Sequence, residues 1–230
     1  TTPARILAHI RGVAVMKKKG AWASFHKRKG LAYLTVITRD YPSALSDICG
    51  TITASDISIL AAQIFTRNDG VIIDTFLVAA GDGGGFIPME SQRDFKRNLL
   101  LVTAGRAKAG DLVRSHALRW RRRKKKAVYS PPRVRFDNAG SSTYTVVDIF
   151  ATDYIGLLYD VTCVFAENGM DIHTARIGTD EDQVADAFYI NKSGGGKIGD
   201  EEDQEKLRRD LITRLDKADA RAGVRWTDNT

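Results

Sequence analysis

Residues 144–160 read Tyr-Thr-Val-Val-Asp-Ile-Phe-Ala-Thr-Asp-Tyr-Ile-Gly-Leu-Leu-Tyr-Asp, and the pattern that they begin continues to Ile190. An apolar run ends at an Asp, a short loop follows, and apolar residues then recur at helical spacing. Two further strand-like runs, 170–179 and 184–190, close the segment. This segment decides the fold because the chain contains it twice.

The repeat is found by aligning the sequence with itself at an offset of 113 residues. Identical or similar residues then match in unbroken order at positions typical of a hydrophobic core. The aligned pairs are Asp40/Asp153, Tyr41/Tyr154, Leu45/Leu158, Asp47/Asp160, Ile48/Val161, Ile52/Phe165, Ile59/Ile172, Ala62/Ala175, Ile64/Ile177, Thr66/Thr179 and, after one deletion, Asp74/Asp186 and Phe76/Phe188. The chain therefore holds two copies of one supersecondary unit.

Each copy predicts the order strand, strand, helix, strand, strand, helix. The fold class that satisfies this order is α+β, with two ferredoxin-like units, each a four-stranded antiparallel sheet with two helices on one face. The strand predicted at 133–138 completes either the second sheet or the first, and the sequence leaves both arrangements open. The predicted organisation is an N-terminal extension at 1–20, a first unit at 21–110, a basic linker at 111–132, a second unit at 133–220 and a tail at 221–230.

The extension begins with Thr-Thr-Pro rather than Met, and Ile6, Leu7 and Ile10 give it one apolar helical face. We expect it to be the tail of a preceding domain. Cys49 and Cys163 lie on predicted helices and are interpreted as small buried residues in a reducing compartment, with a disulfide or a reactive thiol as the alternative. No signal peptide is visible, so a cytoplasmic location is expected.

The formal net charge of +7 suggests nucleic-acid binding until it is located. Residues 119–126 carry seven positive charges, so the remainder of the chain sums to zero. A solvated linker explains this run, and the rival interpretation is a tether that binds nucleic acid or an acidic protein surface. Only Trp120 and Tyr129 could stack on bases, which makes nucleic acid the weaker prediction. No apolar run approaches the roughly 18 residues of a membrane span, so no membrane partner is expected.

The loop of the second copy, Asp153-Tyr154-Ile155-Gly156-Leu157-Leu158, resembles the Asp-x-Pro-Gly-Leu loop of the ACT domain, a small-molecule sensor. Other phrases resemble one family closely, the bifunctional uridylyltransferase/uridylyl-removing enzyme, which modifies the nitrogen-signalling protein PII. They are Gly156-Leu-Leu-Tyr-Asp, Asp171-Ile-His-Thr-Ala-Arg-Ile, Asp186-Ala-Phe-Tyr-Ile, Ile64-Phe-Thr-Arg-Asn-Asp-Gly and Pro132-Arg-Val-Arg-Phe-Asp-Asn. The resemblance covers about 21–218. It implies a C-terminal regulatory piece whose tandem ACT domains sense glutamine and shift the parent enzyme between adding and removing UMP.

The resemblance also implies that catalysis lies elsewhere. The family's nucleotidyltransferase domain carries Gly-Ser and then an Asp-x-Asp metal pair, and no such pair closely follows Gly140-Ser141 here. Its hydrolase domain carries a His-Asp doublet, which none of His9, His26, His116 and His173 forms. We expect no catalytic residue, metal site or cofactor in this chain, with Mg and UTP used by the parent enzyme. The expected partners are L-glutamine or another amino acid, the parent's catalytic domains, PII and, through the ACT units, a second copy.

The physical argument for an amino-acid site starts from the helix that follows each loop. Unpaired N–H groups and a partial positive charge at a helix N-terminus suit a carboxylate, and Gly156 allows ligand and backbone to approach closely. Asp153 and Asp171 are candidate acceptors for the ligand's ammonium group. Such sites usually form between two ACT units, one giving the loop and the other a strand edge. The predicted ligand-binding residues are Asp153, Tyr154, Ile155, Gly156, Leu157, Leu158, Asp171 and Ile172, and in the first copy Asp40, Ser43, Ala44, Leu45, Ser58 and Ile59.

Both loops depart from the family pattern. The first keeps Pro42 but has Ser43 in place of Gly, and its Cβ crowds a ligand or disfavours a positive φ. The second has Ile155 in place of Pro and keeps Gly156. We therefore expect the second loop to bind better and the first to be structural.

Simpler roles stay open for single residues: Asp40 and Asp153 as helix caps, Asp171 as a surface residue, His173 as a partly buried strand residue, and Asp74 and Asp186 as residues that serve the sheet or an interface. The alternative function is a stand-alone tandem ACT amino-acid-binding protein that acts through protein or nucleic-acid contacts.

Overall fold

The computed structural model describes residues 3–28, 31–81, 86–120, 130–180 and 183–222. Its internal contacts divide the chain into two compact units, Thr1–His116 and Ala117–Thr230. The glycine-rich run at 81–85 lies mostly outside the described residues, as does most of the basic run at 119–126.

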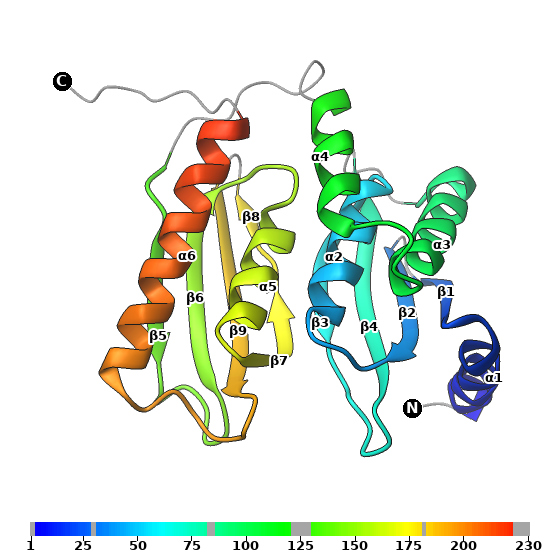
Figure 1. Cartoon of the computed structure of the whole chain (residues 1–230), viewed down its shortest axis with the longest axis horizontal. Helices are drawn as coiled ribbons and strands as arrows, with labels where there is room; N and C mark the ends of the chain where they lie inside the picture. The colour runs from blue at the N-terminus through cyan, green and yellow to red at the C-terminus, as the bar shows by residue number, and fades with distance from the viewer. Residues whose placement is uncertain (1–2, 29–30, 82–85, 121–129, 181–182, 223–230) are drawn as a thin grey trace. The chain divides into compact units, whose positions relative to one another are not determined.

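The first unit has the predicted order of elements (Figure 1). They are β1 (Ala21–Arg28), β2 (Leu31–Arg39), α2 (Ala44–Ala54), β3 (Ile57–Gln63), β4 (Val71–Ala80) and α3 (Met89–Thr103). The strands pair antiparallel in the order β1-β2-β4-β3, so the strand that opens the unit lies at one edge and β4 lies inside the sheet.

The second unit repeats this arrangement. Its elements are β5 (Arg133–Asp137), β6 (Thr145–Thr152), α5 (Leu157–Glu167), β7 (Met170–Arg176), β8 (Thr179–Asp180), β9 (Gln183–Lys192) and α6 (Glu201–Ala222). Pairing of β5 with β6 resolves the open alternative, because this strand completes the second sheet. The order β5-β6-β9-β7 corresponds to that of the first unit, and a register shift after Ile59 recurs after Ile172. The predicted fold class is thus confirmed.

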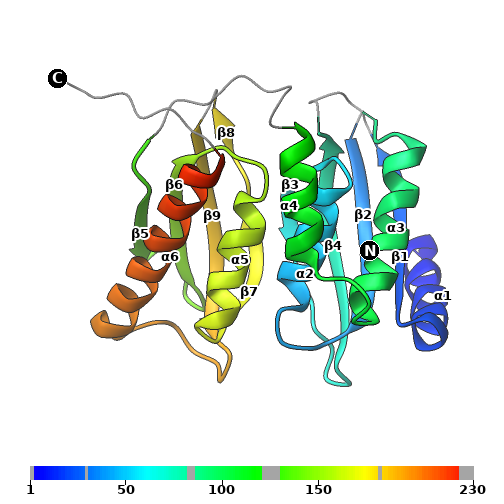
Figure 2. The same cartoon turned by 45° about the horizontal axis from the view of Figure 1, so that its top comes forward.

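Both helices of each repeat cover the same face of their sheet, as Figure 2 shows for α5 and α6. The predicted helical stripes supply the cores beneath them, with one shift at each first helix. There Ala44 and Leu157 are buried, whereas Leu45 and Leu158, which were expected inside, are half-buried. The fully buried residues include Leu34, Val36, Ile48, Ile52, Phe76, Phe95 and Leu99 in the first unit and Val147, Ile149, Val161, Phe165, Phe188, Ile190, Leu207 and Leu211 in the second.

The helix α1 (Pro3–Lys19) extends well beyond the apolar face predicted at Ile6, Leu7 and Ile10 and takes up nearly the whole extension expected at 1–20. It packs on the first sheet, where Met16 joins Ile37 and Val71 in a small hydrophobic cluster. Ile37 alternates with core residue Val36 along β2, so α1 covers part of the face opposite to α2 and α3. The predicted apolar face of α1 is instead exposed, at 49% for Ile6, 56% for Leu7 and 61% for Ile10.

Gly12 is the point where α1 meets this sheet most closely. A Cβ there would lie 2.7 Å from Cδ1 of Ile37 and 2.7 Å from Cε3 of Trp22. We expect Gly12→Val to push α1 off the sheet and to lower the free energy of unfolding by about 1–3 kcal/mol, the usual effect of overpacking. Urea unfolding measures it. Ala14→Val, at an exposed position of the same helix, controls for helix propensity and should change the free energy by less than about 0.5 kcal/mol.

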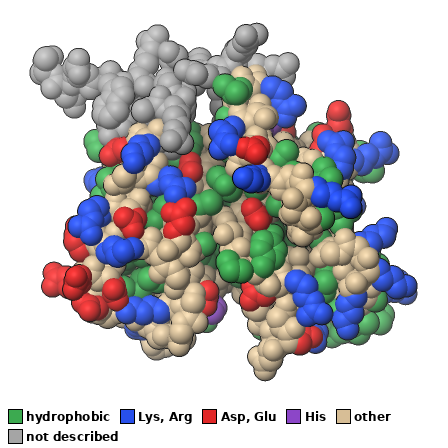
Figure 3. Space-filling model, viewed as in Figure 1, with side chains coloured by type: hydrophobic (Ala, Val, Ile, Leu, Met, Phe, Trp, Pro, Cys, Tyr) green, Lys and Arg blue, Asp and Glu red, His purple; other side chains and the backbone are tan. Residues whose placement is uncertain are grey.

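A further helix, α4 (Ala109–Trp120), begins two residues before the linker expected at 111–132 and takes up its first ten residues. Over the face seen in Figure 3, basic side chains predominate on the first unit, and acidic side chains are more frequent on the second. The zero net charge outside 119–126 is thus the sum of a basic and an acidic part. Cys49 is buried, Cys163 is half-buried, and neither forms a disulfide. Among the described residues, no helix has the length and apolar character that crossing a membrane requires.

Candidate functional site

The two predicted loops share one backbone conformation. Each connects the second strand of its unit to the first helix, and the residue before the helix has a left-handed conformation: Ser43 with φ 72° and ψ 7°, and Gly156 with φ 105° and ψ 2°. The chain therefore keeps the loop's shape in the first unit without glycine. We expected the Cβ of Ser43 to keep this residue from a positive φ, and that expectation is wrong. A residue with a Cβ is nevertheless strained in this conformation.

The carbonyls of the loop partly satisfy the first turn of each helix. The N–H of Ala44 donates to Tyr41 O at 3.0 Å, and the N–H of Leu157 donates to Tyr154 O at 3.2 Å. Neither Ser43 nor Gly156 caps its helix through a side chain, and in the described chain no hydrogen bond joins Asp40 or Asp153 to the first turn. Helix capping therefore does not explain these two aspartates. Other backbone N–H groups in the first turn of each helix therefore remain available to an external acceptor.

A tyrosine–aspartate pair spans each loop. The Tyr41 hydroxyl donates to Oδ2 of Asp47 at 3.1 Å, and the Tyr154 hydroxyl donates to Oδ2 of Asp160 at 3.0 Å. In the first unit, burial and the neighbouring Asp47 raise the pKa of Tyr41, and burial also raises the pKa of Asp47 against the hydrogen bond from Tyr41. The pair ties the middle of the loop to the helix that follows it.

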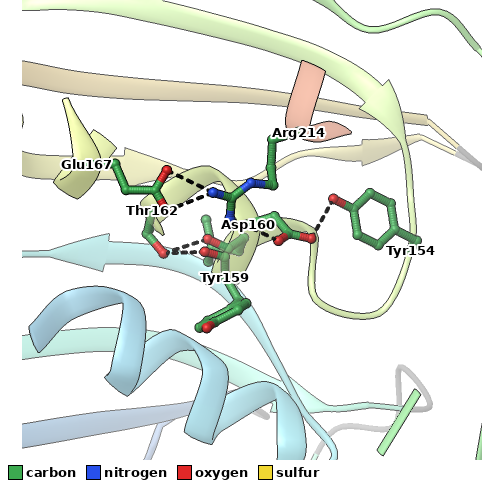
Figure 4. Close-up of polar contacts among 7 residues, drawn as sticks. Tyr154, Tyr159, Asp160, Thr162, Glu167 and Arg214 are labelled. Atoms are coloured by element: carbon green, nitrogen blue, oxygen red, sulfur yellow. Dashed lines mark hydrogen bonds and ion pairs between the residues drawn. The ribbon is translucent and has the colours of Figure 1, made fainter. Parts of the chain in front are cut away.

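The second unit adds an arginine to this pair (Figure 4). Arg214 of α6 lies 3.6 Å from Oδ1 of Asp160 and holds both oxygens of Glu167, at 2.7 and 2.8 Å. Asp160 is thereby engaged through both oxygens, by Tyr154 on one side and Arg214 on the other. The sequence repeat could not reveal this residue because Val102 occupies the equivalent place on α3, three residues after the matching buried leucines Leu99 and Leu211.

A buried carboxyl group lies near each loop on the central strand of the sheet. Asp74 has no exposed surface, and its Oδ1 accepts the N–H of Phe65 at 3.1 Å. Burial raises the pKa of Asp74 to about 8, and the charge of Asp40 contributes. In the described structure Oδ2 of Asp74 has no hydrogen-bond partner.

The second unit repeats the arrangement. Oδ1 of Asp186 accepts the N–H of Gly178 at 3.2 Å, and burial together with the charge of Asp153 raises the pKa of Asp186 to about 7. These aspartates sit inside the sheet, as the structural reading of Asp74 and Asp186 predicted. The sequence alone, however, could not show that Asp40 and Asp153 lie close enough for their charges to raise the pKa of these buried carboxyls.

The register places some predicted residues far from their own loop. Asp171 pairs with Asn191, at the level where β6 begins, whereas the loop follows the end of β6 at Thr152. Seven residues of β6 separate the two, roughly 23 Å at about 3.3 Å per residue. Asp171 is exposed and its Oδ1 accepts a hydrogen bond from the Ser193 hydroxyl at 2.8 Å.

Ile172, Ser58 and Ile59 lie at the same far end of their units, with both isoleucines buried. Within one unit, therefore, the structure brings together residues 153–158 or 40–45 and does not add the strand-start residues to them. Asp40 and Ser43 are exposed, Gly156 is buried, and Asp153, Tyr154 and Ile155 are half-buried. His173 is half-buried beside Tyr144, with ring centroids 4.6 Å apart, in agreement with the strand-residue interpretation.

The described residues include no group of three or more His, Cys, Asp or Glu side chains that could hold a metal ion. What the loop offers is recognition chemistry: a helix N-terminus for an anionic group, a half-buried carboxylate at Asp153, and a tyrosine whose hydroxyl is already committed to Asp160.

Comparison with known proteins gives matches to both the unit and the whole chain. Residues 133–218 match the family model described as an ACR9-like, ACT-like domain. A bifunctional uridylyltransferase/uridylyl-removing enzyme of Gluconobacter oxydans (strain 621H) is 32% identical over 83% of this chain and 20% of its own length. The enzyme of that name from Azospirillum brasilense is 29% identical over 81% of this chain and 20% of its own length. The chain thus spans about a fifth of the length of these curated relatives.

Among solved structures, an unknown protein from Galdieria sulphuraria aligns with 83% of this chain and 92% of its own, at 11% identity and a TM-score of 0.25, which is too low a likeness to carry an argument. The sequence comparisons are the informative ones. Residues 133–218 match the ACT-like domain, and the two relatives confirm the predicted resemblance of the chain to the bifunctional uridylyltransferase/uridylyl-removing enzymes.

Proposed function

We propose that this chain is a regulatory module that binds an amino acid, glutamine, and thereby controls the transfer and removal of UMP on PII by the catalytic domains of a uridylyltransferase/uridylyl-removing enzyme. The observation that supports it most is the duplicated left-handed loop that leads into a helix N-terminus in both units. Similarity to enzymes of that name over about four-fifths of the chain supports the parent's identity.

The loop of the second unit is the proposed site. The ligand's carboxylate accepts N–H groups at the start of α5, where Gly156 leaves room for close approach. Its ammonium group is bound by the half-buried carboxylate of Asp153. Asp171 and Ile172 lie too far from the loop of their own unit to touch the same ligand. They can contribute to the site only from a second copy of the chain. No step of UMP chemistry is assigned to this chain, and Mg and UTP belong to the parent's catalytic domains.

A thermal-shift screen of the 230-residue chain against the common amino acids tests the proposal. We expect glutamine to raise the melting temperature more than any other amino acid, because a ligand at about 100 times its Kd stabilises the folded state by about 2.7 kcal/mol. Glutaminamide, which lacks the α-carboxylate, is the matched control and should give little shift. A chain that responds to no amino acid, or equally to glutaminamide, contradicts the proposal.

A further inference from the structure

The two loops differ in the charge that surrounds their first helical turn. Each turn carries an acidic residue, Asp47 or Asp160, beside the N–H groups that a carboxylate would use. A negative side chain there repels an incoming anion, and partial burial reduces the screening of that repulsion by water. Asp160 is paired with Arg214, whereas burial and Tyr41 alone govern the pKa of Asp47.

We propose that Arg214 is the positioning residue that makes the second loop the anion-binding one: it neutralises Asp160 and, through Asp160, holds Tyr154 and the loop in place. This inference rests on the proposed function for its ligand, the α-carboxylate of an amino acid.

The contacts give Arg214 this role. Its guanidinium holds Glu167 with two hydrogen bonds, which fixes the group over α5, and its other nitrogen faces Asp160 at 3.6 Å. Both bonds to Glu167 come from Nη2 and Nη1 faces Asp160, so the planar guanidinium presents two nitrogens to two carboxylates, which a single ammonium group cannot do. Oδ2 of Asp160 stays with the Tyr154 hydroxyl at 3.0 Å, so one chain of contacts runs from α6 to the middle of the loop (Figure 4).

The first unit shows the loop without this device. Val102, which is 6% exposed, replaces the arginine in the equivalent place on α3. Tyr41 and Asp47 keep their hydrogen bond at 3.1 Å, so the loop reaches the same shape without a cation, and the role left for Arg214 in the second unit is to restrict the loop's motion and to neutralise Asp160. Among the described residues of the first unit, no ion pair neutralises Asp47 or joins it to α3 as Arg214 joins Asp160 to α6.

Arginine variants of the 230-residue chain test the inference by calorimetry with glutamine. Arg214→Met keeps an unbranched apolar stem and removes the charged group, and it should weaken the Kd for glutamine at least about tenfold. Arg214→Lys restores the charge without the fork and should recover part of the affinity. The double variant Arg214→Met/Asp160→Asn removes the repelling carboxylate as well, so it should recover the part of the affinity that the charge accounts for and bind at least about threefold more tightly than Arg214→Met.

An arginine that only positions the loop predicts no such recovery, because asparagine can still accept the Tyr154 hydroxyl but does not restore the contact with α6. Wild-type affinity in Arg214→Met, or a double variant as weak as the single one, overturns the inference while leaving the proposed function intact.

Hydrogen exchange provides a readout that needs no ligand. Arg214→Met should speed exchange in residues 153–160 and leave 40–47 unchanged, whereas Val102→Met should change neither segment. If the wild-type chain binds no amino acid, the proposed function fails, and unchanged exchange in 153–160 then also overturns the positioning role of Arg214.

Discussion

Gly156→Val is expected to abolish amino-acid binding, with a Kd for glutamine raised at least about 100-fold, or about 2.7 kcal/mol. Gly156 has φ 105°, a conformation that a β-branched residue scarcely adopts. The variant must either strain the loop or change its path. In both cases the N–H groups at the start of α5 move away from the carboxylate, and the new side chain occupies the ligand's space. Isothermal titration calorimetry with glutamine measures the loss.

Ser43→Val is the matched control in the first unit. Ser43 has φ 72°, so valine there suffers a comparable strain and disturbs a loop of the same shape. Glutamine affinity should stay within about threefold of wild type, because the first loop is proposed to be structural. An equal loss in both variants would show that both loops bind, and a loss only in Ser43→Val would reverse the ranking.

Asp74→Asn is expected to stabilise the first unit at alkaline pH, with a gain on the order of 5 kcal/mol at pH 9, since each unit of pKa shift corresponds to about 1.4 kcal/mol. Burial raises the pKa of Asp74 from 3.8 to about 8, so in this range the folded chain keeps a proton that the unfolded chain releases. The protonated carboxyl's contribution to stability is complete below about pH 4 and disappears as the pH rises through 8. Asparagine carries no charge at any pH and can still accept the N–H of Phe65.

Urea titrations at pH 5 and pH 9 measure this effect as the change in the free energy of unfolding. The wild-type chain should lose stability between the two pH values, and Asp74→Asn should lose much less. Asp186→Asn is the parallel test in the second unit, where the pKa of about 7 places the loss at lower pH. Equal pH dependence in wild type and both variants would contradict ionisation of these carboxyls as its cause.

The overall fold could be predicted because its determinants are local and duplicated. Periodicity located the strands and helices, and the repeat aligned Asp74 with Asp186 and Ile59 with Ile172, which the structure places at equivalent registers. Pairing of β5 was not predictable from local pattern, because the choice between two sheets depends on contacts distant in sequence.

The candidate site was predictable only in part. The loop residues are contiguous, so the motif alone brought Asp153 and Gly156 together. Asp171 is adjacent to the loop in neither sequence nor register, and the left-handed Ser43 departs from the backbone preference of serine because the duplicated framework imposes the turn. Arg214 had no counterpart in the other copy, so comparison of the repeats pointed away from it.

Ser43 already adopts the turn that glycine adopts in the second unit, so Ser43→Gly would relieve strain without requiring any neighbour to rearrange. Two substitutions would therefore give the first unit the features of the second. Ser43→Gly would lower the backbone strain of the loop, and an arginine in place of Val102 could supply a cation for Asp47. Under the proposed function, the first loop could therefore gain a ligand by side-chain changes alone, while the framework stays the same.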